Sequence, residues 1–212
     1  MTRPQAPADA APPARRDRRH LRHEATRQEI LDTAWAMVRA DGLAALSLSA
    51  LARAVGMEPQ SLYTYFASKH AVYDAMFAQG NQQLLERMAR NQWPDDARGI
   101  LRLQAKTFVA FSAEDPARQQ LLFERTIPDF EPSPESYALA IEVVERSRAA
   151  LADAGLVKQD DFDLWTALVA GLAVQQLAND PGGRRWLRLV DGAVDMYADH
   201  VLGTSPRATR RR

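Results

Sequence analysis

Residues 47–69 constrain this chain most, because they predict two short helices joined by a tight turn. Apolar residues share one face of the first helix: Leu48, Leu51, Ala52 and Val55. Ser47 is a good N-cap for that helix, since its hydroxyl can accept a free backbone N–H. Gly56 stands where the chain reverses and can adopt a left-handed backbone there. Pro59 suits the first turn of a second helix, where an N–H is not needed.

The second helix is predicted to anchor on Leu62 and to expose polar and aromatic side chains. The exposed set is Pro59, Gln60, Ser61, Tyr63, Thr64 and Tyr65. Short hydrogen-bonding groups and flat rings suit the base edges and phosphates of DNA. The alternative is an ordinary helical hairpin inside an all-α core.

The sequence that follows favours the DNA-binding interpretation. Leu62-Tyr63-x-Tyr65-Phe66-x-Ser68-Lys69 resembles the DNA-binding domain of the TetR/AcrR family of transcriptional regulators. The resemblance covers residues 24–84 and places the helix-turn-helix motif at about 47–66. It implies a three-helix DNA-binding head, a connecting fourth helix and a helical body.

The resemblance also assigns roles to individual residues of the head. It implies DNA contacts at Ser47, Ser49, Pro59, Gln60, Ser61, Tyr63, Thr64, Tyr65 and Lys69. Glutamine pairs with adenine through two hydrogen bonds, whereas tyrosine and lysine suit phosphates. The alternative for the two tyrosines is packing against Phe66, and for Lys69 a solvated helix start. A homodimer would read a near-palindromic double-stranded DNA operator.

Long amphipathic stretches separated by proline and glycine predict an all-α fold of about nine helices. We expect a disordered basic arm at 1–20 and a helix-turn-helix domain at 21–70. A helical effector-binding and dimerisation domain follows at 71–203, and a disordered tail at 204–212. The first helix is predicted at 24–40, and the last two at 160–178 and 184–202.

Charge and composition narrow the functional classes. The net charge is zero, but residues 1–23 hold six arginines against two aspartates, and residues 204–212 hold four arginines. Such a basic arm can attract DNA phosphates; the alternative is a solubilising tail. The chain has no cysteine, no secretory leader and no membrane-spanning run, so we expect a cytoplasmic protein without a membrane partner.

The body is expected to hold an effector pocket and a dimer interface, both implied by the resemblance. Candidate pocket residues are Gln104, Phe108, Phe111, Phe123, Tyr137, Trp165 and Gln175. An apolar or aromatic molecule of unknown identity would suit such walls. Candidate interface residues are Leu168, Gly171, Leu172, Trp186, Leu189, Val190, Val194 and Tyr197. The alternative for both sets is the core of the single chain.

These features together favour a DNA-binding transcriptional regulator, a dimeric repressor released from its operator by a ligand. A helical enzyme is disfavoured, because the four histidines are scattered and no nucleophile or phosphate-binding motif is present. We expect no catalytic residue, no metal and no cofactor. An architectural DNA-binding protein without an effector is the remaining alternative, and a pocketless core would favour it.

Overall fold

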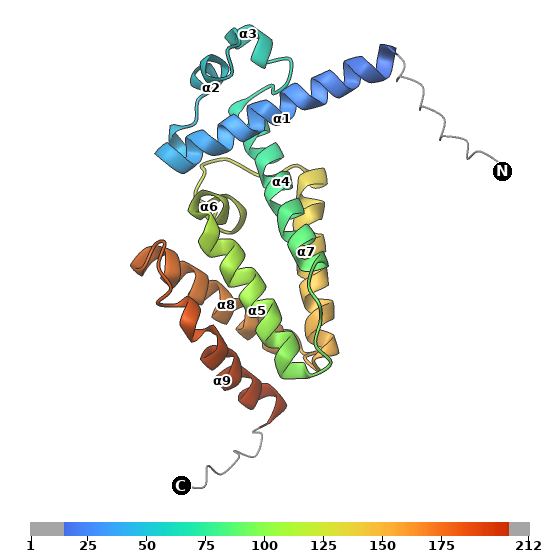
Figure 1. Cartoon of the computed structure of the whole chain (residues 1–212), viewed down its shortest axis with the longest axis vertical. Coiled ribbons are helices and arrows are strands. Elements are labelled where there is room, and N and C mark those ends of the chain that lie inside the picture. Colours follow the sequence, from blue (N-terminus) through green and yellow to red (C-terminus); the bar gives the residue numbers. More distant parts are fainter. Residues whose placement is uncertain (1–14, 204–212) are drawn as a thin grey trace, which may run out of the picture.

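The computed structural model describes residues 15–203, which form nine α-helices and two short 3-10 turns, with no strand in that range. The all-α prediction is therefore confirmed. The head comprises α1 (Arg15–Asp41), α2 (Leu48–Ala54) and α3 (Pro59–Leu62), and α4 (Lys69–Ala89) runs from it into the body (Figure 1). The body is built from α5 (Ala97–Glu114), α6 (Pro116–Phe123), α7 (Pro134–Asp153), α8 (Gln159–Asn179) and α9 (Val190–Leu202). The predicted disorder of residues 1–14 and 204–212 lies outside the described residues.

The local signals of the helix-turn-helix are confirmed. The Ser47 hydroxyl accepts the Ala50 N–H at 3.2 Å and so caps α2. Gly56 has φ 69°, in the left-handed region, and Pro59 opens α3. Leu62 is only 1% exposed, which shows that α3 is anchored as expected.

Two predicted helix boundaries are wrong. The first helix begins at Arg15 rather than near residue 24, so the last part of the predicted basic arm is helical. Extending an established helix needs no new nucleus, and residues 15–23 include five arginines and a leucine, which are good helix formers. The last helix begins at Val190 rather than at residue 184.

Side chains explain the late start of α9. The buried Gln176 carboxamide oxygen accepts the N–H groups of Trp186 at 2.9 Å and Leu187 at 3.2 Å. The Asp180 carboxylate accepts the Arg185 N–H at 2.7 Å, and this lowers the Asp180 pKa. These contacts hold the loop in a turn, and a 3-10 turn (Leu187–Leu189) leads into α9.

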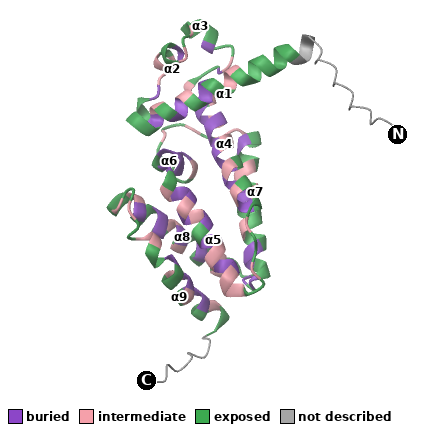
Figure 2. Cartoon of the chain, in the orientation of Figure 1, coloured by how far each residue is buried: buried purple, intermediate pink, exposed green. Residues whose placement is uncertain are grey.

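Burial follows the inner faces of the helices (Figure 2). One cluster lies under the head, where α1, α2, α3 and the start of α4 meet around residues such as Ile30, Leu51 and Leu62. A second cluster joins α5, α8 and α9, and a smaller one joins α4, α5 and α7. Tyr73 of α4 is fully buried and donates its hydroxyl to the Leu43 carbonyl at 2.5 Å, so α4 is fixed to the head.

Polar contacts tie the head to the body. The Trp35 indole N–H donates to the Gln79 side chain at 2.6 Å, which links α1 to α4. Arg39, near the end of α1, donates to the Asp115 carboxylate at 2.7 and 2.9 Å, and Asp115 caps α6. This ion pair joins α1 directly to the start of α6.

Candidate functional site

The second helix of the helix-turn-helix presents a polar outer surface. Most of its predicted DNA contacts are exposed: Pro59, Gln60, Ser61, Tyr63 and Thr64. The Thr64 hydroxyl donates to the Ser61 carbonyl at 2.7 Å and so helps to close this short helix. The exposed Gln60 keeps both its amide donors and its carbonyl acceptor available, which is the pattern that reads adenine.

The start of α2 contributes two serines to the same head. Ser49 is exposed, whereas Ser47 is partly buried. The Ser47 oxygen already accepts a backbone N–H as the N-cap, but its hydroxyl hydrogen remains able to donate. A phosphate oxygen near this helix start would find a donor and the positive end of α2.

Tyr65 and Lys69 have partners within the chain. The Tyr65 ring stacks on His23 of α1, with ring centroids 4.7 Å apart and planes 24° from parallel. The Lys69 ammonium donates to the Ala44 carbonyl at 3.0 Å and lies 5.4 Å from the Tyr73 ring centroid. Sequence reasoning missed His23, because this stack joins α1 to the turn that follows α3.

The seven predicted pocket residues do not converge on one cavity. Phe108 meets Phe123 edge-on at 5.3 Å, and Phe111 lies 3.6 Å beneath the Arg118 guanidinium. Trp165 packs against Tyr197 in the core of α5, α8 and α9. Gln104 is buried and donates to the Ser147 carbonyl at 3.1 Å. The remaining two, Tyr137 and Gln175, are exposed.

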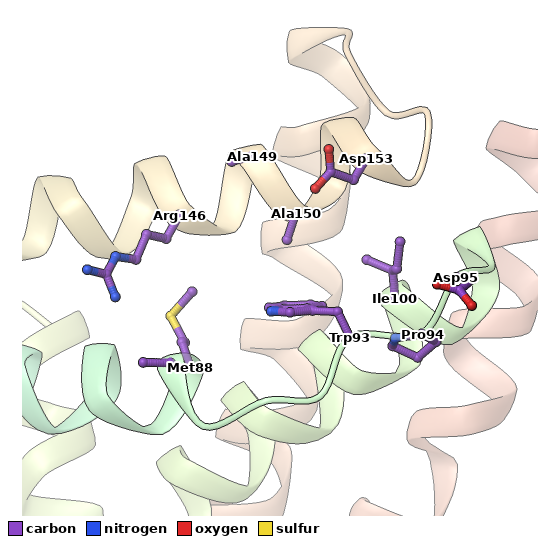
Figure 3. Close-up of a pocket in the computed structure, with 10 residues that line it drawn as sticks. Met88, Trp93, Pro94, Asp95, Ile100, Arg146, Ala149, Ala150 and Asp153 are labelled. Atoms are coloured by element: carbon purple, nitrogen blue, oxygen red, sulfur yellow. The ribbon is translucent and has the colours of Figure 1, made fainter.

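A cavity of about 470 Å³ lies instead at the end of the body remote from the head, between the end of α4, the start of α5 and the second half of α7 (Figure 3). Its lining comprises Met88, Ala89, Trp93, Pro94, Asp95, Ile100, Arg146, Ala149, Ala150 and Asp153. None of the seven predicted residues lines it. Sequence reasoning missed these lining residues, because no local pattern shows that α7 approaches the segment around Trp93.

The last two helices present an apolar outer face, but not through all of the residues expected. Four of the predicted interface residues are buried in the core of the chain itself and offer little surface to a partner: Leu172, Val190, Val194 and Tyr197. Trp186 and Leu168 pack on that core and are half-buried, whereas Gly171 and Leu189 are exposed as expected. Further apolar side chains are exposed on these helices: Leu164, Val174, Met196 and Leu202.

The helical phase of α9 decides which of its apolar side chains face the core. Tyr197 turns inward because α9 packs on α5 and because its hydroxyl donates to the Asp161 carbonyl at 2.5 Å. Burial, followed by the Asp161 charge, raises the pKa of Tyr197 to about 12. The outward stripe therefore runs through Leu189, which was predicted, and through Met196, which was not.

Other kinds of site find little support in residues 15–203. No group of three or more histidine, cysteine, aspartate or glutamate side chains that could hold a metal lies in this range. No helix described here is long and apolar enough to cross a membrane. The exposed polar surface of the head remains the strongest candidate site.

The head consists of two short helices joined by a turn in which Gly56 has a left-handed backbone conformation, and its outer surface is polar. Together with the all-α body, this arrangement defines a helix-turn-helix protein of the regulatory class. Residues 30–76 match the model of the bacterial regulatory proteins of the tetR family. This match covers the head and the start of α4, so this part of the chain resembles the DNA-binding domain of that family.

A curated relative is similar over about three quarters of this chain. The chain is 26% identical over 159 residues to the HTH-type transcriptional repressor Rv1353c of Mycobacterium tuberculosis, an alignment that covers 74% of this chain and 58% of that protein. The chain thus matches little more than half the length of this relative.

Two solved structures share the fold. One is a protein of unknown function from Rhodococcus sp. RHA1, with a TM-score of 0.70, 19% identity, and coverage of 81% of this chain and 92% of that chain. The other is a TetR-family transcriptional regulator from Bordetella parapertussis 12822, with a TM-score of 0.59, 22% identity, and coverage of 85% and 98%.

Proposed function

We propose that this protein is a homodimeric repressor that binds a near-palindromic DNA operator and is released from it by a small apolar or aromatic ligand. The single observation that carries the proposal is the exposed polar surface of α3, held rigidly by the buried Leu62. A four-residue helix would not persist alone, so its packing on α2 is what makes the surface a fixed reading head.

DNA binding by this head has two components. Gln60, Ser61 and Thr64 face outward and would contact base edges, and Pro59 would pack on thymine methyl groups. Tyr63 is 55% exposed and is free to reach a phosphate. Lys69 and Tyr65 would contact phosphates while keeping their partners in the chain, because Lys69 has three N–H donors and one is used.

Dimerisation is supported by the outer face of α8 and α9. Leu164, Gly171 and Val174 follow one another along α8 at the spacing of a helix–helix contact. Leu189 and Met196, 49% and 65% exposed, extend this face onto α9. An added Cβ at Gly171 would meet nothing within 4 Å in the chain, so this glycine leaves room for close approach of a partner helix. A two-fold dimer supplies two heads for two half-sites.

Ligand response is supported by the position of α4. This 21-residue helix begins in the head at Lys69 and reaches the cavity at Met88, a span of about 30 Å. A molecule in the cavity would contact the C-terminal end of α4, and the N-terminal end of the same helix packs in the head. Binding would then favour a spacing of the two heads that does not match the operator.

The two alternatives from the sequence are weaker. A cavity of this size counts against a purely architectural DNA-binding protein. The family is one of transcriptional regulators, which counts against a helical enzyme. We place the protein in the cytoplasm, where its DNA target would lie.

The test is selection of bound sequences from random duplex DNA, followed by affinity and stoichiometry for the enriched site. The proposal expects an enriched near-palindrome bound by two chains or a multiple of two. The Gln60→Ala variant should relax base preference, whereas Lys69→Ala should weaken binding to all sequences and flatten the salt dependence. Absence of any enriched sequence in the wild-type protein would overturn the proposal.

A further inference from the structure

The cavity at the far end of α4 combines an aromatic wall with apolar neighbours. Trp93 lies across the space between Met88 and Ile100, beneath α7 (Figure 3). The Trp93 side chain stands on the loop between α4 and α5 and is 41% exposed, although it is a large aromatic group. A flat ring held open to a cavity offers its π-face to a ligand.

Two carboxylates border the same cavity without a counter-charge. Asp153 is the last residue of α7, and Asp95 lies on the loop before α5. Neither forms an ion pair with any residue between 15 and 203. The position of Asp153 is also unfavourable, because the carbonyl end of a helix carries partial negative charge.

The helix ends strengthen this negative character. Both α4 and α7 finish at the cavity, where Ala89 and Asp153 are their last residues and line it. The N-terminal end of α5 also points at the cavity, but Asp96 caps it by accepting the Gly99 N–H at 2.8 Å. The positive end of α5 is therefore already offset by a carboxylate.

One cation borders the cavity, and it has a partner. Arg146 of α7 donates to the Glu142 carboxylate at 2.6 Å, one turn away on the same helix. Figure 3 shows Arg146 at the opposite end of the cavity from Asp95. With Arg146 balanced by Glu142, the unbalanced charge is that of Asp95 and Asp153.

We propose that this cavity binds a flat aromatic cation, with its ring on Trp93 and its positive charge near Asp153 and Asp95. A ring cation is attracted both by the tryptophan face and by the carboxylates, whereas an anion is repelled by the same groups. The inference deepens the proposed function by naming the class of effector, and its regulatory consequence rests on that function.

Direct binding in the absence of DNA tests the site. Three probes of nearly equal shape are titrated calorimetrically into the full chain near neutral pH: the 9-aminoacridinium cation, neutral acridine and the acridine-9-carboxylate anion. DNA is left out because acridines insert between base pairs. We expect the cation to bind at least about 10-fold more tightly than the anion, and added salt to weaken the cation.

Variants assign the binding to the cavity. Trp93→Ala should weaken the cation about 10-fold, and Trp93→Phe should restore part of the loss. Asp153→Asn should weaken it about 3- to 10-fold and reduce its salt dependence. The matched control is Asp160→Asn, which removes an exposed carboxylate at the start of α8, outside the cavity, and should change nothing.

Three results would overturn the site: no binding of any probe, tighter binding of the anion, or unchanged affinity in both Trp93→Ala and Asp153→Asn. All these positions are partly or fully exposed, so circular dichroism should confirm that each variant folds. Cation binding that leaves operator affinity unchanged would uphold the site and refute only its regulatory role. A failed DNA selection would refute the proposed function and leave the calorimetric result standing.

Discussion

The contact between Arg39 and Asp115 makes a quantitative prediction about the junction of head and body. Asp115 is 5% exposed and serves three groups at once. One carboxylate oxygen accepts two N–H groups of Arg39 at 2.7 and 2.9 Å, and the other accepts the Arg118 backbone N–H at 3.1 Å. Burial lowers the pKa of the Arg118 side chain, and the Asp115 charge partly offsets this shift.

Replacement of Asp115 separates these contributions. Loss of the α6 cap costs about 1 kcal/mol. Loss of the pair with Arg39, which is half exposed, costs at most about 1 kcal/mol. Removal of the negative charge beside the buried Arg118 adds about 1 kcal/mol, since the Glu114 carboxylate, 3.9 Å from Arg118, remains. Asp115→Ala should therefore destabilise the chain by about 3 kcal/mol, and Asp115→Asn, which can still cap α6, by about 2 kcal/mol.

Equilibrium unfolding in urea at fixed protein concentration measures these differences through the midpoint, because dimerisation would make stability depend on concentration. The control is Arg39→Gln, which leaves the α6 cap in place and removes the half-exposed pair and the contact of Arg39 with the Trp35 ring, so it should cost about 1–2 kcal/mol. For a chain of this size, about 3 kcal/mol corresponds to a fall in Tm of roughly 6–12 °C. The reasoning is refuted if Asp115→Asn is as stable as the wild type, or if Arg39→Gln is as destabilising as Asp115→Ala.

Three further predictions concern the outer face, the buried tyrosine and the basic start of α1. Met196→Glu should raise the dimer dissociation constant at least about 10-fold in sedimentation equilibrium, because it places like charges across the two-fold axis. The control is Val157→Glu, which changes another exposed apolar residue. Equal effects of the two variants would count against the α8–α9 interface. Since the Tyr197 pKa is raised from 10.0 to about 12, the folded chain holds this proton more tightly, so stability is fully retained below pH 10 and falls as pH rises toward 12. In the Tyr197→Phe variant, the urea midpoint should fall less between pH 10 and 12 than it does in the wild type. An identical pH profile in the two proteins would contradict the assignment of this effect to Tyr197. The third variant changes three exposed arginines of α1 to glutamine: Arg18, Arg19 and Arg22. The slope of log affinity for the operator against log salt concentration should flatten by up to about 0.9 per lost phosphate contact. An unchanged slope would mean that these arginines only make the protein more soluble.

The fold class and the reading head could be predicted from the sequence because their signals are local. Ser47 and Ser68 each precede an amphipathic helix, where serine is a favoured N-cap. Both hydroxyl oxygens accept the backbone N–H of the residue three positions further along. Gly56 and Pro59 act through their own backbone restrictions, which do not depend on distant residues. Leu62 is buried because the helical period allows little choice once the turn is fixed.

The candidate effector site and the outer face depend on contacts between distant segments. The cavity needs Trp93, which follows α4, to meet Asp153, which ends α7, and no local pattern reports that approach. The stack of His23 on Tyr65 has the same origin.

On α9, the sequence alone determined that one face is apolar, and the tertiary structure decided which apolar residues face the core. Val190, Val194 and Tyr197 turn inward because α5 lies on that side and because Tyr197 finds the Asp161 carbonyl, which leaves Met196 outside. Whether a segment forms an amphipathic helix depends on residues that are neighbours in the sequence. Which of its apolar residues face the core depends on how the helix packs against elements far along the chain.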